Sequence, residues 1–134
     1  MSRPLVVAGL LGFFGVAFGA FGAHALRDWF AMLPDGDRRM GWWQTAVDYQ
    51  MWHAPLLLAL AWRKEAGVET SADVGAYLTL AGVFLFSGSL YAMALTGLTW
   101  FGAITPVGGL CLLGGWVALL FAARSPRRDG GATA

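Results

Sequence analysis

Charge is scarce in this sequence. Only 13% of its 134 residues are Asp, Glu, Lys or Arg, and 57% are hydrophobic. A typical soluble domain carries roughly 25% charged residues. A small chain exposes a large surface relative to its volume, and so few charges cannot cover that surface. The composition therefore argues against a soluble globular or disordered protein and predicts a membrane protein.

Other features are also missing. The net charge is only +1, which provides no basic field for nucleic acid. The single cysteine, Cys111, cannot form an internal disulfide, and we interpret it as a small packing residue. The sequence contains no metal-ligand spacing, P-loop, nucleophile elbow or dinucleotide fingerprint. We therefore predict no metal, no cofactor and no catalytic residues.

What the chain does contain is a set of long apolar runs. The charges, Asp48 excepted, fall at the N-terminus, between the runs and in the C-terminal tail. A helix needs roughly 20 apolar residues to cross a membrane. Backbone N–H and C=O groups in lipid must form their hydrogen bonds within the segment, because no water is available there. The runs therefore predict transmembrane helices, at residues 4–26, 41–62, 74–97 and 103–123.

These runs predict one all-α membrane domain over residues 1–134, an antiparallel up-down four-helix bundle with short loops. Asp35 or Asp37 is expected to cap the second helix, and Thr105 the fourth, ahead of Pro106. Apolar spacing in residues 27–33 predicts a short amphipathic segment at the membrane interface. With these caps, the four helices are expected over about 4–26, 37–62, 73–97 and 105–123, followed by a disordered tail over about 125–134.

The basic residues predict the orientation. With four spans, both termini and the second loop share one side, which holds six basic residues against three on the other. The positive-inside rule then places both termini in the cytoplasm. A cleaved signal peptide is the alternative for the first run, but that run is longer than usual and rich in glycine. The six residues are Arg3, Arg63, Lys64, Arg124, Arg127 and Arg128.

Small residues form ridges on two of the expected helices. Gly12, Gly15, Gly19 and Gly22 follow helical spacing on the first helix. Gly108 and Gly115 belong to a similar row on the fourth helix. Such ridges let helices in lipid approach closely. We expect packing within the bundle, and a homodimer interface is the alternative that nothing else in the sequence indicates.

Polar residues within the runs are confined to one half of the expected bundle. With the termini inside, all of them lie between the middle of the membrane and its outer surface. Ionisable groups at such depth are costly, and they usually indicate a functional site. Polar side chains can, however, also hydrogen-bond helices to one another. A ligand or proton site and structural bonding therefore both remain open. The cluster comprises His24, Asp48, Tyr49, Gln50, His53, Ser87, Ser89, Tyr91 and Thr105.

His53 is the centre of this prediction. We expect it to be buried, neutral and hydrogen-bonded to a hydroxyl or amide from Tyr49, Gln50, Ser87, Ser89 or Tyr91. A haem shared with His24 is not expected, because the two histidines should differ in depth by about 10 Å at the rise of a helix.

Four ordered strings carry a resemblance to a known family. They are FGAFGAHAL at 18–26, YQMWHA at 49–54, FSGSLY at 86–91 followed by ALTG at 94–97, and GAITPVGG at 102–109 with GW at 115–116. Together they resemble the YgdD-type small inner-membrane proteins, a bacterial family of unknown function with a mitochondrial transmembrane relative in animals. The resemblance implies a four-helix integral protein of the bacterial inner membrane and implies no catalytic site.

Three classes of function stay open. The first is a non-enzymatic membrane protein, structural or accessory to a larger membrane complex, with the polar cluster as internal bonding. The second is a small-ligand site, for quinone or lipid, around His53, Tyr49 and Tyr91 in the outer half of the bundle. The third is a proton or ion pathway, which the apolar inner half disfavours. The predicted partners are the lipid bilayer and a membrane protein, and no nucleic acid.

Overall fold

A computed structural model describes residues 3–66 and 68–124 of the chain. All regular structure within these residues is helical, and they contain no strand. The prediction of an all-α chain is therefore confirmed. The predicted disordered tail, residues 125–134, lies outside the described part of the chain.

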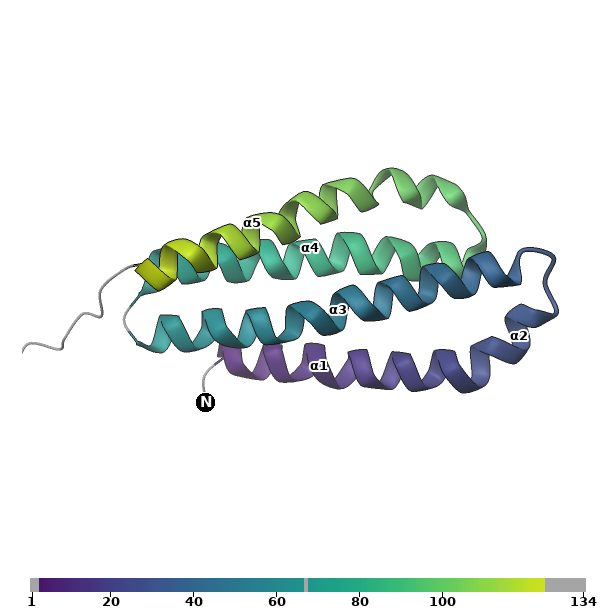
Figure 1. The fold of residues 1–134 in the computed structure, drawn as a ribbon, viewed down its shortest axis with the longest axis horizontal. Helices are drawn as coiled ribbons and strands as arrows, with labels where there is room; N and C mark the ends of the chain where they lie inside the picture. The colour runs from purple at the N-terminus through teal and green to yellow at the C-terminus, as the bar shows by residue number, and fades with distance from the viewer. Residues whose placement is uncertain (1–2, 67, 125–134) are drawn as a thin grey trace, which may run out of the picture.

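Four long helices run antiparallel along the molecule (Figure 1). α1 begins at the end of the bundle where α5 finishes, and this end is called the termini end here. The opposite end, which carries α2 and the connection from α4 to α5, is the loop end. The predicted four-helix, up-down bundle is confirmed. The bounds are α1 Arg3–Phe21, α3 Gly36–Glu65, α4 Glu69–Thr96 and α5 Thr105–Arg124.

The first helix does not stop before the predicted interfacial segment. α1 continues through a π-helical stretch, η1 (Gly22–Leu26), into the short helix α2 (Arg27–Ala31). The segment predicted over 27–33 is therefore largely the end of one continuous rod. The Trp43 indole donates a hydrogen bond of 2.9 Å to the Phe18 carbonyl just before the π-helical stretch. Side chains that bond to the backbone in this way commonly accompany such bulges.

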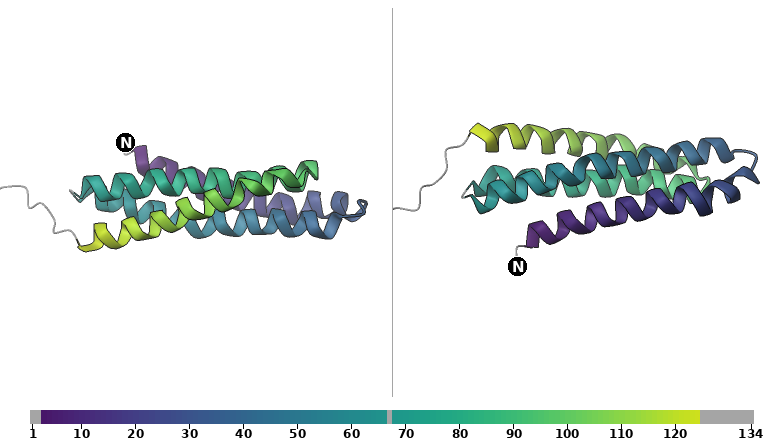
Figure 2. Two further views of the ribbon diagram at one scale, coloured as in Figure 1. Left: turned by 90° about the horizontal axis from the view of Figure 1, so that it is seen from above. Right: turned by 60° about the horizontal axis from the view of Figure 1, so that its bottom comes forward.

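The helices are not packed equally. The extensive contacts are those of α4 with α5, α3 with α4 and α1 with α3, while α5 touches α3 at fewer positions. α3 and α4 therefore form the middle of the bundle, with α1 and α5 as its outer helices (Figure 2). A 3-10 helix, η2 (Thr99–Ala103), leads from α4 into α5.

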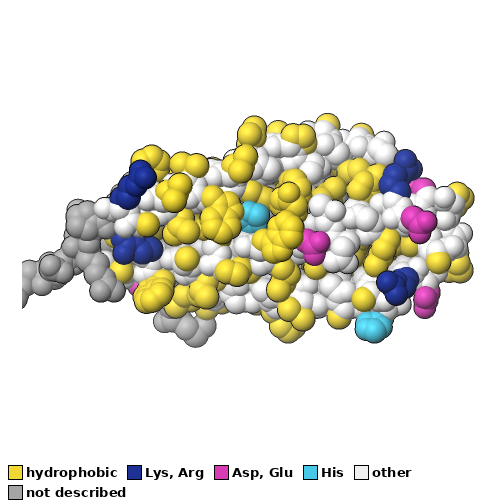
Figure 3. All heavy atoms as spheres, viewed as in Figure 1, with side chains coloured by type: hydrophobic (Ala, Val, Ile, Leu, Met, Phe, Trp, Pro, Cys, Tyr) yellow, Lys and Arg dark blue, Asp and Glu magenta, His cyan; other side chains and the backbone are white. Residues whose placement is uncertain are grey.

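Hydrophobic side chains cover the middle of the surface, and the Lys and Arg side chains gather at its two ends (Figure 3). Three segments of the described chain are long and apolar enough to cross a membrane: Leu5–Ala31, Ser71–Thr96 and Thr99–Arg124. α3 is not among them, because its polar and charged residues lower its mean hydropathy. It packs against the other three long helices, which bury Gln50 and His53, whereas Gln44 and Thr45 are exposed.

At each end of the bundle an arginine side chain donates hydrogen bonds to carbonyl groups at the end of another helix. At the loop end Arg39 donates to the carbonyls of Ala94 and Leu95, both at 3.4 Å, where α4 ends. At the termini end Arg63 Nε donates to the Ala122 carbonyl of α5 at 3.1 Å. Both arginines meet carbonyl groups that a helix leaves without partners at its C-terminus.

The predicted cap of the second helix is only half right. Asp35 is the N-cap residue of α3, but its side chain makes no capping bond to the backbone. Its carboxylate instead accepts from Arg39 Nε at 2.9 Å and from Arg38 at 3.4 Å. The hydrogen bond from Arg39 is the main reason that the pKa of Asp35 lies below its usual value.

Candidate functional site

The polar residues predicted as one cluster form separate groups in the structure. His24 is exposed on η1, and Asp48 accepts a 3.0 Å hydrogen bond from Gln44 of its own helix. The others divide between the α5 side and the α1 side of the central helix pair. His24 is therefore not part of a common site, because the rod formed by α1 and α2 presents it outward.

His53 lies on the α5 side. It is 5% exposed, its Nδ1 lies 2.7 Å from the Tyr49 carbonyl, and its Nε2 lies 3.1 Å from the Trp116 indole nitrogen. Since the indole can only donate, Nε2 accepts and Nδ1 carries the proton to the Tyr49 carbonyl. Both ring nitrogens of a neutral imidazole are thereby satisfied.

This arrangement corrects the predicted partners of His53. None of the predicted side-chain hydroxyls or amides reaches the ring, and the donor is Trp116 of α5. An indole within an apolar helix needs an acceptor, and that requirement was the one signal in the sequence that pointed to Trp116. A cavity of about 450 Å³ beside this pair is lined by residues including Tyr49, Trp52, Phe86 and Trp116.

Gln50 bonds in two directions on the α1 side. Its Nε2 donates to the Leu11 carbonyl of α1 at 2.9 Å, and its Oε1 accepts from the Tyr91 hydroxyl of α4 at 3.0 Å. Gln50 is 4% exposed, so water cannot replace these partners. Its Nε2 would lack an acceptor without α1, and its Oε1 would lack a donor without α4. One amide thus connects three helices.

Ser89 and Thr105 form a third group near the loop end. Their hydroxyl oxygens lie 2.8 Å apart, and Ser89 also donates to the Phe86 carbonyl at 2.9 Å. Thr105, the predicted N-cap, is instead the first residue of α5, and its side chain bonds to Ser89 of α4. This group joins the start of α5 to α4.

Ser87 is the one member of the cluster that is buried and unpaired. It is 1% exposed, and its Oγ is the only fully buried side-chain polar atom of the described residues without a hydrogen-bond partner. Leaving a buried hydroxyl unsatisfied costs about 1–3 kcal/mol. An orphan of this kind needs an explanation such as a bound molecule.

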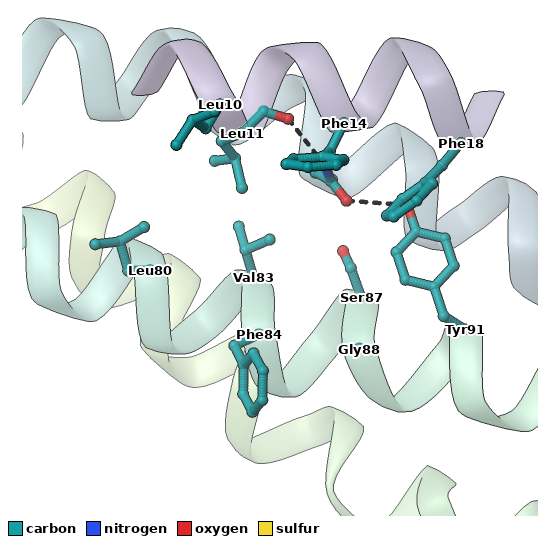
Figure 4. A pocket seen from close by; sticks show the side chains of 11 residues that line it. Leu10, Leu11, Phe14, Phe18, Leu80, Val83, Phe84, Ser87, Gly88 and Tyr91 are labelled. Atoms are coloured by element: carbon teal, nitrogen blue, oxygen red, sulfur yellow. Dashed lines mark hydrogen bonds between the residues drawn. The ribbon is translucent and has the colours of Figure 1, made fainter. Parts of the chain in front are cut away.

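Other hydroxyls within the helices show that an unpaired hydroxyl is avoidable. Thr45, Thr79 and Thr96 each donate to the backbone carbonyl one turn earlier, at 2.9, 2.8 and 2.6 Å. Ser89 does the same to a carbonyl three residues back. Such bonds are the usual solution for a hydroxyl within a helix. Ser87 does not use its own helix in this way, and its side chain is directed toward α1 (Figure 4).

A cavity of about 430 Å³ lies where Ser87 points, between α1 and α4 (Figure 4). This volume is within the range of small-molecule sites. We call it the α1–α4 groove. Its walls are apolar apart from one amide, one phenol and one hydroxyl. The lining residues are Leu10, Leu11, Phe14, Phe18, Gln50, Leu80, Val83, Phe84, Ser87, Gly88 and Tyr91.

The glycine ridge of α1 faces α3. A Cβ atom at Gly12 would lie 3.9 Å from that of Ala54, and one at Gly19 would lie 3.4 Å from Val47. At Gly15 and Gly22 it would collide with the side chains of Met51 and Trp43.

The glycines of α5 differ from those of α1 in what they contact. At Gly108 an added Cβ would lie 2.8 Å from the Cα of Phe86, and at Gly115 it would collide with Thr79. α5 therefore rests partly on the backbone of α4, whereas α1 rests on side chains of α3.

No metal site is formed by the part of the chain that the structure describes. It contains no group of three or more His, Cys, Asp or Glu side chains that could hold an ion. His24 is exposed and His53 buried with both nitrogens bonded, so the two do not form a haem-ligand pair.

Comparison with known proteins agrees with this architecture. Residues 18–109 match a family described as protein of unknown function (DUF423). The chain is 38% identical to the inner membrane protein YgdD of Escherichia coli K12 over 126 residues, which cover 94% of this chain and 92% of that one. It is 36% identical to the membrane protein YwdK of Bacillus subtilis 168 over 125 residues, which cover 92% and 97%.

No solved structure shows significant similarity to the chain. The match to the family model and the identities along nearly the whole chain agree with the four-string resemblance and with the apolar helical bundle. The chain therefore belongs to the DUF423 family of membrane proteins of unknown function.

Proposed function

We propose that this protein is a non-enzymatic membrane protein that binds a small apolar molecule in the α1–α4 groove. The observation that carries the proposal is the buried, unpaired hydroxyl of Ser87 directed into an apolar cavity. A ligand with one polar group would satisfy that hydroxyl and fill the crevice. Sites of this kind are mostly apolar, with a few placed polar groups.

The composition of the groove favours binding over catalysis. Its lining includes no histidine, cysteine or carboxylate, so no general base stands beside Ser87. Tyr91 already bonds to Gln50, and Gln50 to the Leu11 carbonyl of α1, which suits the two side chains to shape the site. A serine without a neighbouring base is a weak nucleophile and serves better as a hydrogen-bond donor.

This proposal moves the ligand site from the α5 side to the α1 side of the bundle. The alternative function predicted from the sequence had its ligand site around His53, Tyr49 and Tyr91, but both ring nitrogens of His53 are occupied by Tyr49 and Trp116. A ligand there would have to displace the indole. In the α1–α4 groove a ligand displaces no hydrogen bond and gains one.

Native purification in mild detergent tests the proposal. Co-purifying lipids and proteins are identified by mass spectrometry for the wild type, for Leu10→Trp and for Leu120→Trp. Leu10 lines the groove and is half exposed, so a larger side chain can enter the groove without disturbing the core, whereas Leu120 is exposed on α5. We expect one apolar species with the wild type and the Leu120 variant that is depleted in the Leu10 variant.

Equal amounts of the same species in all three proteins would disprove the proposal. So would the absence of any retained molecule. A protein partner retained independently of the groove would instead favour the accessory role in a larger membrane complex.

We also propose that the protein resides in the bacterial inner membrane with both termini in the cytoplasm. The support is the name of a relative, an inner membrane protein, and the excess of basic residues that the sequence assigns to the two termini and the second loop. Alkaline phosphatase fused after Ala134 should be inactive in a bacterial host, and a fusion within the connection between α4 and α5 should be active. The reverse pattern would overturn the orientation.

A further inference from the structure

The residues of the α1–α4 groove are largely sorted along its length, with Phe84 beside Val83 as an exception. Leu10, Leu11, Leu80 and Val83 form one part of its wall, toward the termini end (Figure 4). Phe14, Phe18 and Tyr91 lie toward the loop end, together with the Ser87 hydroxyl. Gln50, which bonds to the Tyr91 hydroxyl, belongs to the same end. The groove thus has an aliphatic end and an aromatic, hydrogen-bonding end.

The aliphatic end of the groove adjoins a second cavity. Leu80 also lines a second cavity of about 470 Å³, whose other apolar walls include Val7, Leu57 and Tyr77. The second cavity lies nearer the termini end, where the salt bridge between Lys64 and Asp73 is found. A molecule with an aliphatic tail longer than the groove could continue past Leu80 into this space.

The depth of Ser87 limits the chemistry of the ligand. Ser87 lies a few residues beyond the middle of the apolar span Ser71–Thr96, which is about 5 Å along a helix. The hydrocarbon core is about 30 Å thick, so the hydroxyl lies some 10 Å below its surface. The ester groups of a phospholipid stay near that surface. The partner of Ser87 must therefore carry its polar group deep within the hydrocarbon.

From these observations we propose that the occupant is a prenyl quinone, a flat ring with carbonyl groups and a long isoprenoid tail. This inference rests on the proposed function and specifies the ligand of the same groove. A ring carbonyl accepts the Ser87 hydroxyl, and the ring packs on Phe14, Phe18 and Tyr91. The tail lies along Leu10, Leu11 and Val83. The headgroup of such a molecule can enter the membrane interior, as the depth of Ser87 requires.

The aromatic end is rigidly built, as a ring-binding surface needs to be. The rings of Phe18 and Tyr91 meet edge to face with centroids 5.2 Å apart, and the Trp43 ring lies 4.7 Å from that of Tyr91. The hydroxyl of Tyr91 is held by Gln50. Aromatic surfaces in fixed positions favour stacking or edge contacts with a planar ligand. The proposal concerns binding only and includes no electron transfer.

Photolabelling in native membranes tests the inference. The probe is an azido-benzoquinone with a decyl tail, and the labelled peptides are identified by mass spectrometry. We expect labels on α1 and α4, at or beside Phe14, Phe18 and Tyr91. An excess of decylubiquinone should abolish the labelling, and an excess of decanol should not.

Substitutions sharpen this test. Ser87→Ala should reduce labelling roughly tenfold, which is the loss expected for one hydrogen bond in an apolar site. Ser89→Ala is the matched control and should not reduce it, because Ser89 bonds to Thr105 outside the groove. Labels beside Trp116, or equal labelling of the Ser87 variant, would overturn the inference.

The failures of the two proposals can be told apart. If decanol competes as well as the quinone and the groove still retains an apolar species on purification, the quinone is wrong and the binding function stands. If Leu10→Trp changes neither the labelling nor the retained species, both are wrong.

Discussion

The two outer helices, α1 and α5, are held to the bundle in different ways. Glycines of α5 approach the backbone of α4, and the buried polar groups on that side have partners, as with His53 and Trp116. α1 lies on side chains of α3 and leaves the crevice that contains the unpaired Ser87. We call the α5 side closed, because helix backbones approach there and its polar groups are paired, although a cavity of about 450 Å³ lies beside His53 and Trp116, and we call the α1 side open. The buried polar groups of the α5 side are thus paired, whereas the α1 side combines the paired Gln50 with one unpaired hydroxyl, that of Ser87.

The largest expected effect is on the closed side. Gly108→Ala should lower the free energy of unfolding by about 3 kcal/mol, because its Cβ would meet the backbone of Phe86 and overpacked sites relax poorly. Gly12→Ala is the control on the open side. It should be neutral or stabilising by up to about 1 kcal/mol, since alanine favours helix and the space exists. Unfolding in dodecyl sulfate, followed by circular dichroism, measures both. Similar losses for the two variants would remove the contrast between the helices.

Trp116→Phe should have the next largest effect. It leaves the buried Nε2 of His53 without its donor, at a cost of about 1–2 kcal/mol. Trp62→Phe is the control, since Trp62 is exposed. The same unfolding assay should separate the two variants. If they behave alike, His53 contributes nothing to holding α5.

Ser87→Ala should act in the opposite direction. In protein stripped of bound lipid, removal of the unpaired hydroxyl should leave stability unchanged or raise it by up to about 1 kcal/mol. Ser89→Ala removes a bonded hydroxyl and should lower stability by about 1 kcal/mol. Melting temperatures of the two variants provide the measurement. A marked loss on Ser87→Ala would mean that this hydroxyl has a partner within the folded protein.

The smallest expected effect concerns the loop end, where the rod of α1 and α2 turns into α3. The hydrogen bond from Arg39 lowers the pKa of Asp35 in the folded protein, so the ionised carboxylate stabilises the fold at neutral pH. This contribution should disappear as the pH falls below about 3.9, the value in an unfolded chain, and through the lowered folded value. Asp35→Asn should lack that part of the pH dependence, whereas Asp28→Asn, at an exposed carboxylate, should keep it. Melting temperatures across acidic pH would reveal the difference, and identical curves would contradict it.

Much of the fold was predictable because lipid leaves few alternatives. Long uncharged runs must become helices when no water is available to the backbone, and short loops then impose an antiparallel bundle. The polar residues of the candidate site were also recognisable, because polar groups are rare in such runs. Their grouping was not: Gln50 and His53 share a helical face by spacing, yet one bonds to α1 and α4 and the other to α5.

The sequence by itself determined that this is an all-α membrane protein, where its long helices lie, and which family it belongs to. Only the tertiary structure decided which partner each polar side chain has. The hydrogen bond of a buried group depends on the few ångströms between neighbouring helices, which spacing along one helix does not specify. The lateral placement of α1 is the clearest case. Because α1 packs on α3 rather than on α4, Gln50 gains the Leu11 carbonyl as a partner, Ser87 gains none, and a groove remains between α1 and α4.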